Sequence, residues 1–185
     1  CVWRIAAVDQ TVDEFITHVW SLSLSVTSGR LLVTTSSSLL LYGADGLRLQ
    51  QIALPEYRKA DHAVETPRGT YIVCHSLAFR HGVSEVDGAG RAVRVYYDGP
   101  PGPGPLQLNN PCHVTQFAAG RRLLIADRGN SRLLSLTADL KLDRVLLTAD
   151  HDQLDEKPWR LSVNEETQRL IVGGDNSRRV AVYRL

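Results

Sequence analysis

Two histidines at corresponding places in a repeated pattern are the first candidates for chemistry. His62, His113 and Arg160 occupy equivalent positions in three short segments that align with one another. Neutral imidazoles on neighbouring elements can hold a catalytic metal ion. A guanidinium is no metal ligand and repels a cation, so Arg160 in the third position favours packing or hydrogen bonding over a metal site at the two histidines.

A second group of candidates consists of arginines and aromatic residues in turns between predicted strands. The candidate binding residues are Arg80, His81, Arg128, Arg132, Trp159, Arg160, Arg178 and Arg179. The Arg121-Arg122 pair is expected on the same surface, with Trp159 and Tyr96 as stacking platforms. Such a surface is typical of protein recognition by arginine and aromatic anchors, or of RNA binding through phosphate contacts and base stacking.

Other catalytic patterns are missing from the sequence. It contains no Gly-x-Ser-x-Gly elbow and no Gly-x-x-x-x-Gly-Lys-Ser/Thr phosphate loop. The remaining histidines at His18, His75 and His151 have no partner fixed by spacing. A Ser-His-Asp hydrolase and a phosphate-loop nucleotide site therefore have no support in the sequence.

The elements that must position these residues are short strands in a repeated unit. Each unit has an apolar core, a polar turn and a second apolar run. The cores are Leu31–Val33, Tyr71–Val73, Leu123–Ile125 and Leu170–Val172, and their last residues lie 40, 52 and 47 residues apart. A recurring period of roughly 40–50 residues built from strands is typical of β-propeller blades.

We therefore predict an all-β chain that forms a partial antiparallel β-propeller of about four to four and a half four-stranded blades. The predicted parts are a half blade over residues 1–19, with strands at Val2–Ile5 and Phe15–Val19, and blades over about 20–55, 62–108, 111–154 and 158–185. In the first full blade the predicted strands are Leu22–Val26, Leu31–Thr34, Leu39–Tyr42 and Leu47–Leu54.

The ends and connections of these blades carry further signals. The last blade has room for three strands, so exposed edges are expected at both ends, where upstream blades or another chain can pair. The segment Asp98–Pro105 is too rich in Pro and Gly for a strand or helix, and we predict an extended loop between two blades.

The turns resemble those of the NHL family of β-propellers, whose blades carry a Pro at the inner strand and an Asp-x-x-Asn-x-Arg turn after a hydrophobic second strand. The third unit has Pro111 and the turn Asp127–Arg132, and the fourth has Pro158 and a looser turn at Asp175–Arg178. The first two units lack the Asp and Arg pair. Asp127 and Arg132 are expected to bridge the hairpin or to tie it to the neighbouring blade.

Among NHL proteins, the chain most resembles the C-terminal NHL regions of invertebrate tripartite-motif-like proteins. In those chains the propeller follows RING and B-box modules and a coiled coil, and the whole resembles a ubiquitin ligase. The resemblance implies a non-catalytic recognition module that binds a protein partner and needs no cofactor. RNA binding through the basic rim is one alternative. A metal-dependent lyase or hydrolase, similar to the NHL-like amidating lyases, is a second.

Composition restricts these expectations only weakly. The chain has 185 residues and a formal net charge of +1, from 21 Lys and Arg against 20 Asp and Glu, so no excess charge indicates a polyanion partner. The sequence contains no run of 18 apolar residues, so it predicts no membrane-spanning helix. Cys1, Cys74 and Cys112 lack metal-type spacing, and buried reduced thiols in a cytoplasmic protein are expected. Since the chain begins with Cys1 and contains no Met, we expect an excerpt from a longer chain.

Overall fold

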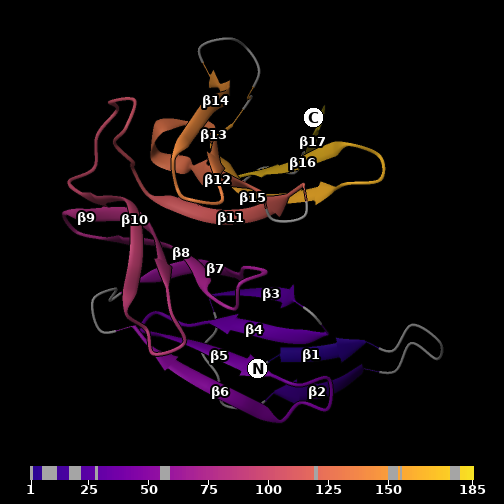
Figure 1. Cartoon of the computed structure of the whole chain (residues 1–185). Coiled ribbons are helices and arrows are strands. Elements are labelled where there is room, and N and C mark those ends of the chain that lie inside the picture. The colour runs from indigo at the N-terminus through magenta and orange to yellow at the C-terminus, as the bar shows by residue number, and fades with distance from the viewer. Residues whose placement is uncertain are drawn as a thin grey trace.

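The structure is a computed structural model, and it describes residues 2–5, 12–16, 22–27, 29–54, 59–118, 121–149, 154, 156–175 and 180–185. They form an all-β, antiparallel β-propeller with four blades (Figure 1). In each blade the strands are hydrogen-bonded in chain order from the inner strand outward. This architecture confirms the fold class predicted from the repeated apolar cores.

Three of the blades have four strands. Blade 1 contains β3 (Ser23–Thr27), β4 (Arg30–Thr34), β5 (Ser38–Tyr42) and β6 (Arg48–Ala53). Blade 2 contains β7 (Ala60–Glu65), β8 (Tyr71–Leu77), β9 (Arg80–Val86) and β10 (Ala92–Gly99). Blade 3 contains β11 (Pro111–Phe117), β12 (Arg122–Asp127), β13 (Arg132–Thr137) and β14 (Leu142–Thr148).

The two ends of the propeller are shorter. Blade 4 contains, among the described residues, β15 (Pro158–Asn164), β16 (Arg169–Gly174) and β17 (Val180–Arg184). A separate pair, β1 (Val2–Ile5) and β2 (Val12–Ile16), packs on the face of blade 1 that points away from blade 2. The second strand of this pair starts earlier than the predicted Phe15–Val19, and residues 17–21 lie outside the described residues. The strands predicted for blade 1 differ from the observed ones by at most one residue at either end.

The apolar cores are continuous because their strands are buried on both faces. On β8, Tyr71 and Val73 pack against blade 1, whereas Ile72 and Cys74 pack against blade 3. A strand covered on both sides reads as an unbroken apolar run instead of an alternating one. Four core clusters follow one another along the chain, one for each interface between consecutive sheets.

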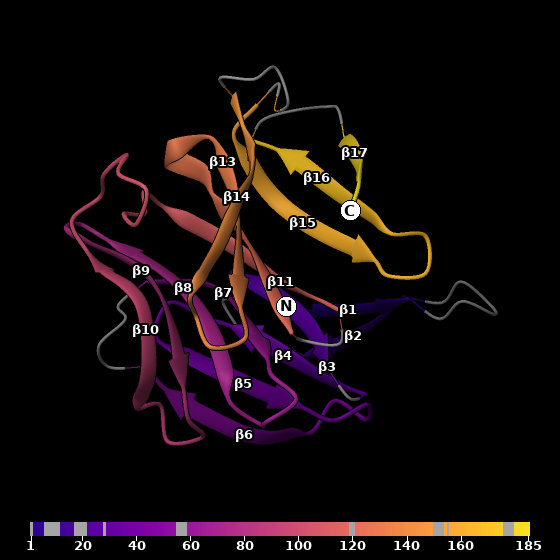
Figure 2. The same cartoon turned by 45° about the horizontal axis from the view of Figure 1, so that its top comes forward.

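The blades follow one another around an arc, with the inner strands on its concave side (Figures 1 and 2). The inner strand β3 contacts β7, β7 contacts β11, and β11 contacts β15. We define the upper rim as the end that carries the connections into β7, β11 and β15 and the turns between second and third strands. The lower rim carries the remaining turns. No helix among the described residues is long and apolar enough to cross a membrane.

Candidate binding site on the upper rim and in the channel

The turn from Asp127 to Arg132 fixes the upper rim of blade 3. Asp127 is fully buried, and its carboxylate accepts hydrogen bonds from Asn109 N, Asn130 Nδ2 and Arg132 Nε, each at 2.7 Å. Gly129 N donates to Asn109 O at 2.7 Å, and a Cβ on this glycine would lie 2.6 Å from that oxygen. The short 3-10 turn η1 (Arg128–Asn130) therefore needs a residue without a side chain at its centre.

Arg132 belongs to the same structural assembly. Its guanidinium also donates to the carbonyls of Gly104 and Gln107, in the connection between β10 and β11. Asn130 Nδ2 donates to Gly102 O at 2.9 Å. These bonds hold the predicted Pro- and Gly-rich loop, which the structure places between blades 2 and 3. The prediction of a loop from Asp98 on is wrong for its first two residues, because Asp98 and Gly99 pair with β9 as the end of β10. The arginine that the sequence offered as a binding residue thus has its donors directed into the protein.

Arg80 forms a contact within blade 2, and His81 ties this blade to the same connection. Arg80 forms a forked ion pair with Asp98 on the neighbouring strand, with Nε 2.9 Å from Oδ1. His81 Nδ1 accepts a hydrogen bond from Asn110 N at 2.7 Å. Figures 1 and 2 both show the connection from β10 to β11 beside the β8–β9 turn. Both residues therefore lie on the upper rim, with their polar atoms engaged by neighbours.

A β-bulge recurs at the start of three inner strands. The register shifts between Ala60 and His62 on β7, between Pro111 and His113 on β11, and between Pro158 and Arg160 on β15. The extra residues are Asp61, Cys112 and Trp159. A bulge redirects a side chain and interrupts the ladder, so this position can turn a residue toward the rim, and in blade 4 that residue is an aromatic one.

Two guanidinium groups lie over the ring of Trp159. The Cζ atoms of Arg128 and Arg160 are 4.5 Å and 5.1 Å from the centre of the indole ring. Asp175, at the end of β16, fixes Arg128 through an ion pair with Nε at 3.0 Å. Arg160 donates to Trp159 O at 3.2 Å and, in the described part of the chain, has no carboxylate within ion-pair distance. We call Arg128, Trp159 and Arg160 the rim stack.

The other predicted members of this surface lie elsewhere. The expectation that Arg121 and Arg122 share it is wrong, because β12 begins at Arg122 on the lower rim and ends at Asp127 on the upper one. Tyr96 is half-buried and packs against the core between blades 2 and 3. Arg178 and Arg179 lie outside the described residues.

His62 and His113 meet in the channel below the rim stack. Their rings are stacked, with centroids 3.7 Å apart and planes inclined by 28°. Burial, together with the positive charge of Arg160, lowers the pKa of His62 to about 3 and that of His113 to about 2. Both imidazoles are therefore neutral near pH 7. The sequence alignment of His62, His113 and Arg160 at equivalent positions is confirmed by the shared bulge and by this contact.

The channel offers few of the ligands that a metal ion needs. Val114 N donates to His62 Nδ1 at 3.4 Å, so one of the two imidazoles already has a partner for that nitrogen. Within the described ranges, no three His, Cys, Asp or Glu side chains are grouped to hold a metal ion. Next to the stacked rings is an open hollow of about 400 Å³ lined by the four inner strands β3, β7, β11 and β15.

Asp61 near the upper end of the channel is half-buried, and two cysteines close to it are buried. Burial raises the pKa of Asp61, and the hydrogen bond from Ser76 Oγ at 2.6 Å opposes that rise. Cys74 and Cys112 are free and buried, as predicted, and burial raises the pKa of the Cys112 thiol to about 12. A thiol that stays protonated is a poor nucleophile, so these cysteines serve packing.

The sequence reasoning missed two exposed apolar residues on this rim. Phe79, in the β8–β9 turn, has 77% of its surface exposed, and Leu106, in the connection between β10 and β11, has 60%. Their turn position is a local signal, but nothing in the sequence marks them as exposed. They add apolar area to a rim that was predicted from arginines alone.

Fold and site together define a β-propeller with an arginine- and aromatic-bearing rim. No protein-family model matches the chain, and a search of curated proteins finds no match. Solved structures do match, at 11–16% identity, which shows the fold alone.

Three of these structures illustrate the range of functions on the fold. A catalytically inactive variant of virginiamycin B lyase from Staphylococcus aureus, with quinupristin, has a TM-score of 0.62 at 11% identity, over 97% of this chain and 61% of its own. The hydrazine synthase of Kuenenia stuttgartiensis has a TM-score of 0.59 at 16% identity, over 85% of this chain and 56% of its own. BBS1N, solved in complex with ARL6DN, has a TM-score of 0.55 at 16% identity, over 89% of this chain and 48% of its own. The chain thus spans about half to three fifths of these propellers, which include enzymes and a protein found in complex with another protein.

Proposed function

We propose that this propeller is a non-catalytic recognition module that binds a protein partner through its upper rim. The observation that carries the proposal is the rim stack, in which the guanidinium groups of Arg128 and Arg160 lie over the half-buried indole of Trp159. Trp and Arg are the residue types that most often dominate the binding energy of protein interfaces. Because Asp175 already orients Arg128, little side-chain entropy remains to be lost on binding.

The charge balance of the rim favours a protein over RNA. Three of its arginines are paired with aspartates: Arg80 with Asp98, Arg128 with Asp175, and Arg132 with Asp127. An RNA-binding surface needs unneutralised cations, since phosphate contacts dominate the affinity. A mixed rim with exposed Phe79 and Leu106 suits the polar and apolar composition of protein interfaces. RNA binding remains the alternative proposal, and it predicts affinity that falls steeply with salt.

A metal-dependent lyase or hydrolase is the less supported alternative. It would use His62 and His113, whose low pKa keeps them unprotonated and so able to bind a metal ion. Against it, Arg160 adds positive charge beside both rings. Zinc titration of the wild type and of His113→Ala tests this proposal directly, and equal, weak binding by both proteins would count against it.

The finer assignment, an NHL-type propeller at the recognition end of a tripartite-motif-like ubiquitin ligase, stays a proposal. Its support is the turn at Asp127–Arg132, which ties its hairpin to the connection before β11 as the resemblance implied. Pro111 and Pro158 both begin inner strands, again as in that family. The cytoplasmic location inferred from the cysteines stays a prediction.

Differential capture from a cell extract tests the proposed function. Tagged wild type, Trp159→Ala and Arg128→Ala are compared with two control variants on the lower rim, Leu47→Ala and Arg91→Ala, whose side chains are exposed. We expect proteins that both controls retain and both rim variants lose, identified by crosslinking and mass spectrometry. Equal capture by all five proteins would contradict binding through the upper rim.

A further inference from the structure

A small pocket lies on the lower rim, at the seam between blades 2 and 3. Its volume is about 170 Å³, and three turns surround it: β7–β8, β11–β12 and β13–β14. Ile72 and Leu123 belong to the core between these blades, so the base of the pocket is apolar. Pro67 and Ala138 extend the apolar wall. Sites for drug-sized ligands enclose roughly 300–1,000 Å³, so this pocket fits one side chain.

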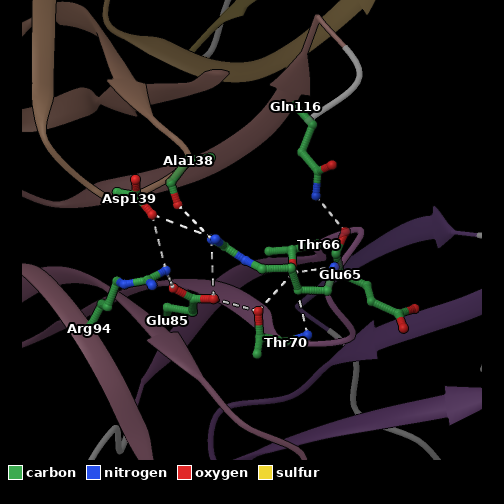
Figure 3. A network of polar contacts seen from close by, with 9 residues as sticks. Glu65, Thr66, Thr70, Glu85, Arg94, Gln116, Ala138 and Asp139 are labelled. Carbon is green, nitrogen blue, oxygen red and sulfur yellow. Dashed lines mark hydrogen bonds and ion pairs between the residues drawn. The ribbon is translucent and has the colours of Figure 1, made fainter. Parts of the chain in front are cut away.

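A buried carboxylate fixes the blade 2 side of the pocket. Glu85 on β9 is almost fully buried, and it accepts hydrogen bonds from Thr70 Oγ1 at 2.5 Å and from Arg94 at 2.9 Å. Arg68, in the β7–β8 turn, lies 3.7 Å from the same carboxylate. Figure 3 shows Arg94 and Thr70 converging on Glu85. The blade 2 wall of the pocket is therefore held in place in the absence of a partner.

The same arginines reach across the seam to blade 3. Arg68 donates to Ala138 O at 3.0 Å and lies 3.5 Å from Asp139. Arg94 lies 3.3 Å from the same carboxylate (Figure 3). On the inner side of the seam, Gln116 of β11 donates to Glu65 O at the end of β7. These contacts hold the two turns at a fixed separation, so the pocket is preformed.

One cation at this pocket is left unneutralised. Arg68 and Arg94 together face Glu85 and Asp139, two positive charges against two negative ones. Arg121 also lines the pocket, is exposed, and has no ion-pair partner among the described residues. The pocket therefore combines an apolar base with one available guanidinium at its mouth.

We propose that this seam pocket docks a segment of a partner protein that carries one apolar side chain next to an acidic residue. The apolar side chain fills the space above Ile72 and Leu123, and Arg121 pairs with the neighbouring carboxylate. Charge complementarity selects an acidic segment, since a basic one would meet the unneutralised Arg121. This site is on the rim opposite to the rim stack, so it is independent of the proposed function.

Fluorescence anisotropy with three labelled decapeptides tests the seam pocket. Each peptide has a Gly and Ser background and differs only at its centre, which is Asp-Leu-Asp, Asp-Ala-Asp or Lys-Leu-Lys. We expect the Asp-Leu-Asp peptide to bind the wild type about tenfold more tightly than either other peptide. Equal affinity for the Asp-Ala-Asp peptide would contradict binding of the leucine side chain in the pocket. Equal affinity for the Lys-Leu-Lys peptide would contradict the selection of an acidic segment by charge.

Protein variants locate the binding. Arg121→Glu is expected to weaken the binding of the Asp-Leu-Asp peptide about tenfold or more, and Arg121→Lys is expected to have an intermediate affinity. Arg144→Glu is the control, because Arg144 is another exposed arginine in the same blade and does not line the pocket. Trp159→Ala should bind the peptide as the wild type does. Unchanged affinity in Arg121→Glu, or no binding by the wild type at millimolar peptide, would refute the proposal.

Discussion

A buried carboxylate on each rim pairs with arginines in different surroundings. On the upper rim, the pair of Asp127 and Arg132 is sealed from water, with side chains 0% and 9% exposed. On the lower rim, Glu85 is buried as well, but its partners Arg68 and Arg94 are 48% and 42% exposed. The same ion pairing therefore has different consequences, because removing the acid strands a buried cation on one rim and a solvated one on the other.

This difference also decides which cations are available to a ligand. Most rim arginines are held by carboxylates, so the number of arginines says little about binding. Arg160 on the upper rim and Arg121 on the lower rim lack such a partner among the described residues, and each lies beside an aromatic or apolar surface. Function is therefore expected where pairing is incomplete.

The largest expected effect is that of Asp127→Ala. It leaves Arg132 buried without a counter-ion and frees the donors of Asn109 and Asn130, so we expect a loss of about 3–5 kcal/mol in the free energy of unfolding. Urea denaturation measures it. A loss below about 1 kcal/mol would mean that the turn is solvated and that the contrast between the rims is wrong.

The channel between the rims should make stability depend on pH. Burial lowers the pKa of His62 to about 3 and that of His113 to about 2, whereas an unfolded histidine titrates near 6.5. Between these values the unfolded chain binds more protons, so stability falls as the pH drops below about 6.5. From pH 6.5 to pH 5 we expect a loss of roughly 2 kcal/mol per histidine. Urea unfolding at both pH values measures it.

A matched variant separates these histidines from other groups. In His113→Phe the loss of unfolding free energy between pH 6.5 and pH 5 should be smaller than in the wild type, by roughly the amount expected for one histidine. Asp61, whose pKa burial raises, has the opposite sign and offsets part of the loss at the lower pH. An unchanged pH dependence in His113→Phe would show that His113 is solvated and already protonated at pH 5.

Glu85→Ala is expected to cost less than the loss of Asp127. Arg68 and Arg94 can turn to water, so the main losses are the bonds from Thr70 and Arg94, about 1–2 kcal/mol in the free energy of unfolding. Glu85→Gln, which keeps an acceptor for Thr70, should lose less than Glu85→Ala. If Glu85→Ala matched Asp127→Ala, exposure of the arginines would not explain the difference between the rims.

The smallest effect is expected for Arg80→Ala. Arg80 is 60% exposed and its partner Asp98 is 16% exposed, so the guanidinium keeps much of its hydration in the folded chain, and we expect a loss of less than about 1 kcal/mol in the free energy of unfolding. Urea denaturation of the variant should show a midpoint close to that of the wild type. A larger loss would place Arg80 with the buried pairs of the upper rim.

The sequence was informative where the signal was local. Continuous apolar cores such as Leu123–Ile125 predicted strands, which the structure shows to be covered on both faces, and the blade period predicted the propeller. The tie between Asp127 and Arg132 was also expected, because both residues belong to one turn. The alignment of His62 with His113 followed from the repeat.

Contacts between distant parts of the chain were not predictable in this way. Arg128 and Asp175 are 47 residues apart, and the angle between blades 3 and 4 brings them together. The same holds for Arg68 and Ala138 across the seam, which are 70 residues apart. The bulge that places Trp159 on the rim is a register irregularity without a sequence signature. Local patterns therefore located the arginines but not their partners.

The affinity of a captured partner for Trp159→Ala tests the central claim most directly. Isothermal titration of the wild type and the variant at about 50 and 300 mM salt separates anchoring by the rim stack from attraction by charge. We expect the variant to bind at least about tenfold more weakly at both salt concentrations. Equal affinity of the two proteins, or wild-type binding that disappears at the higher salt, would contradict recognition through the rim stack.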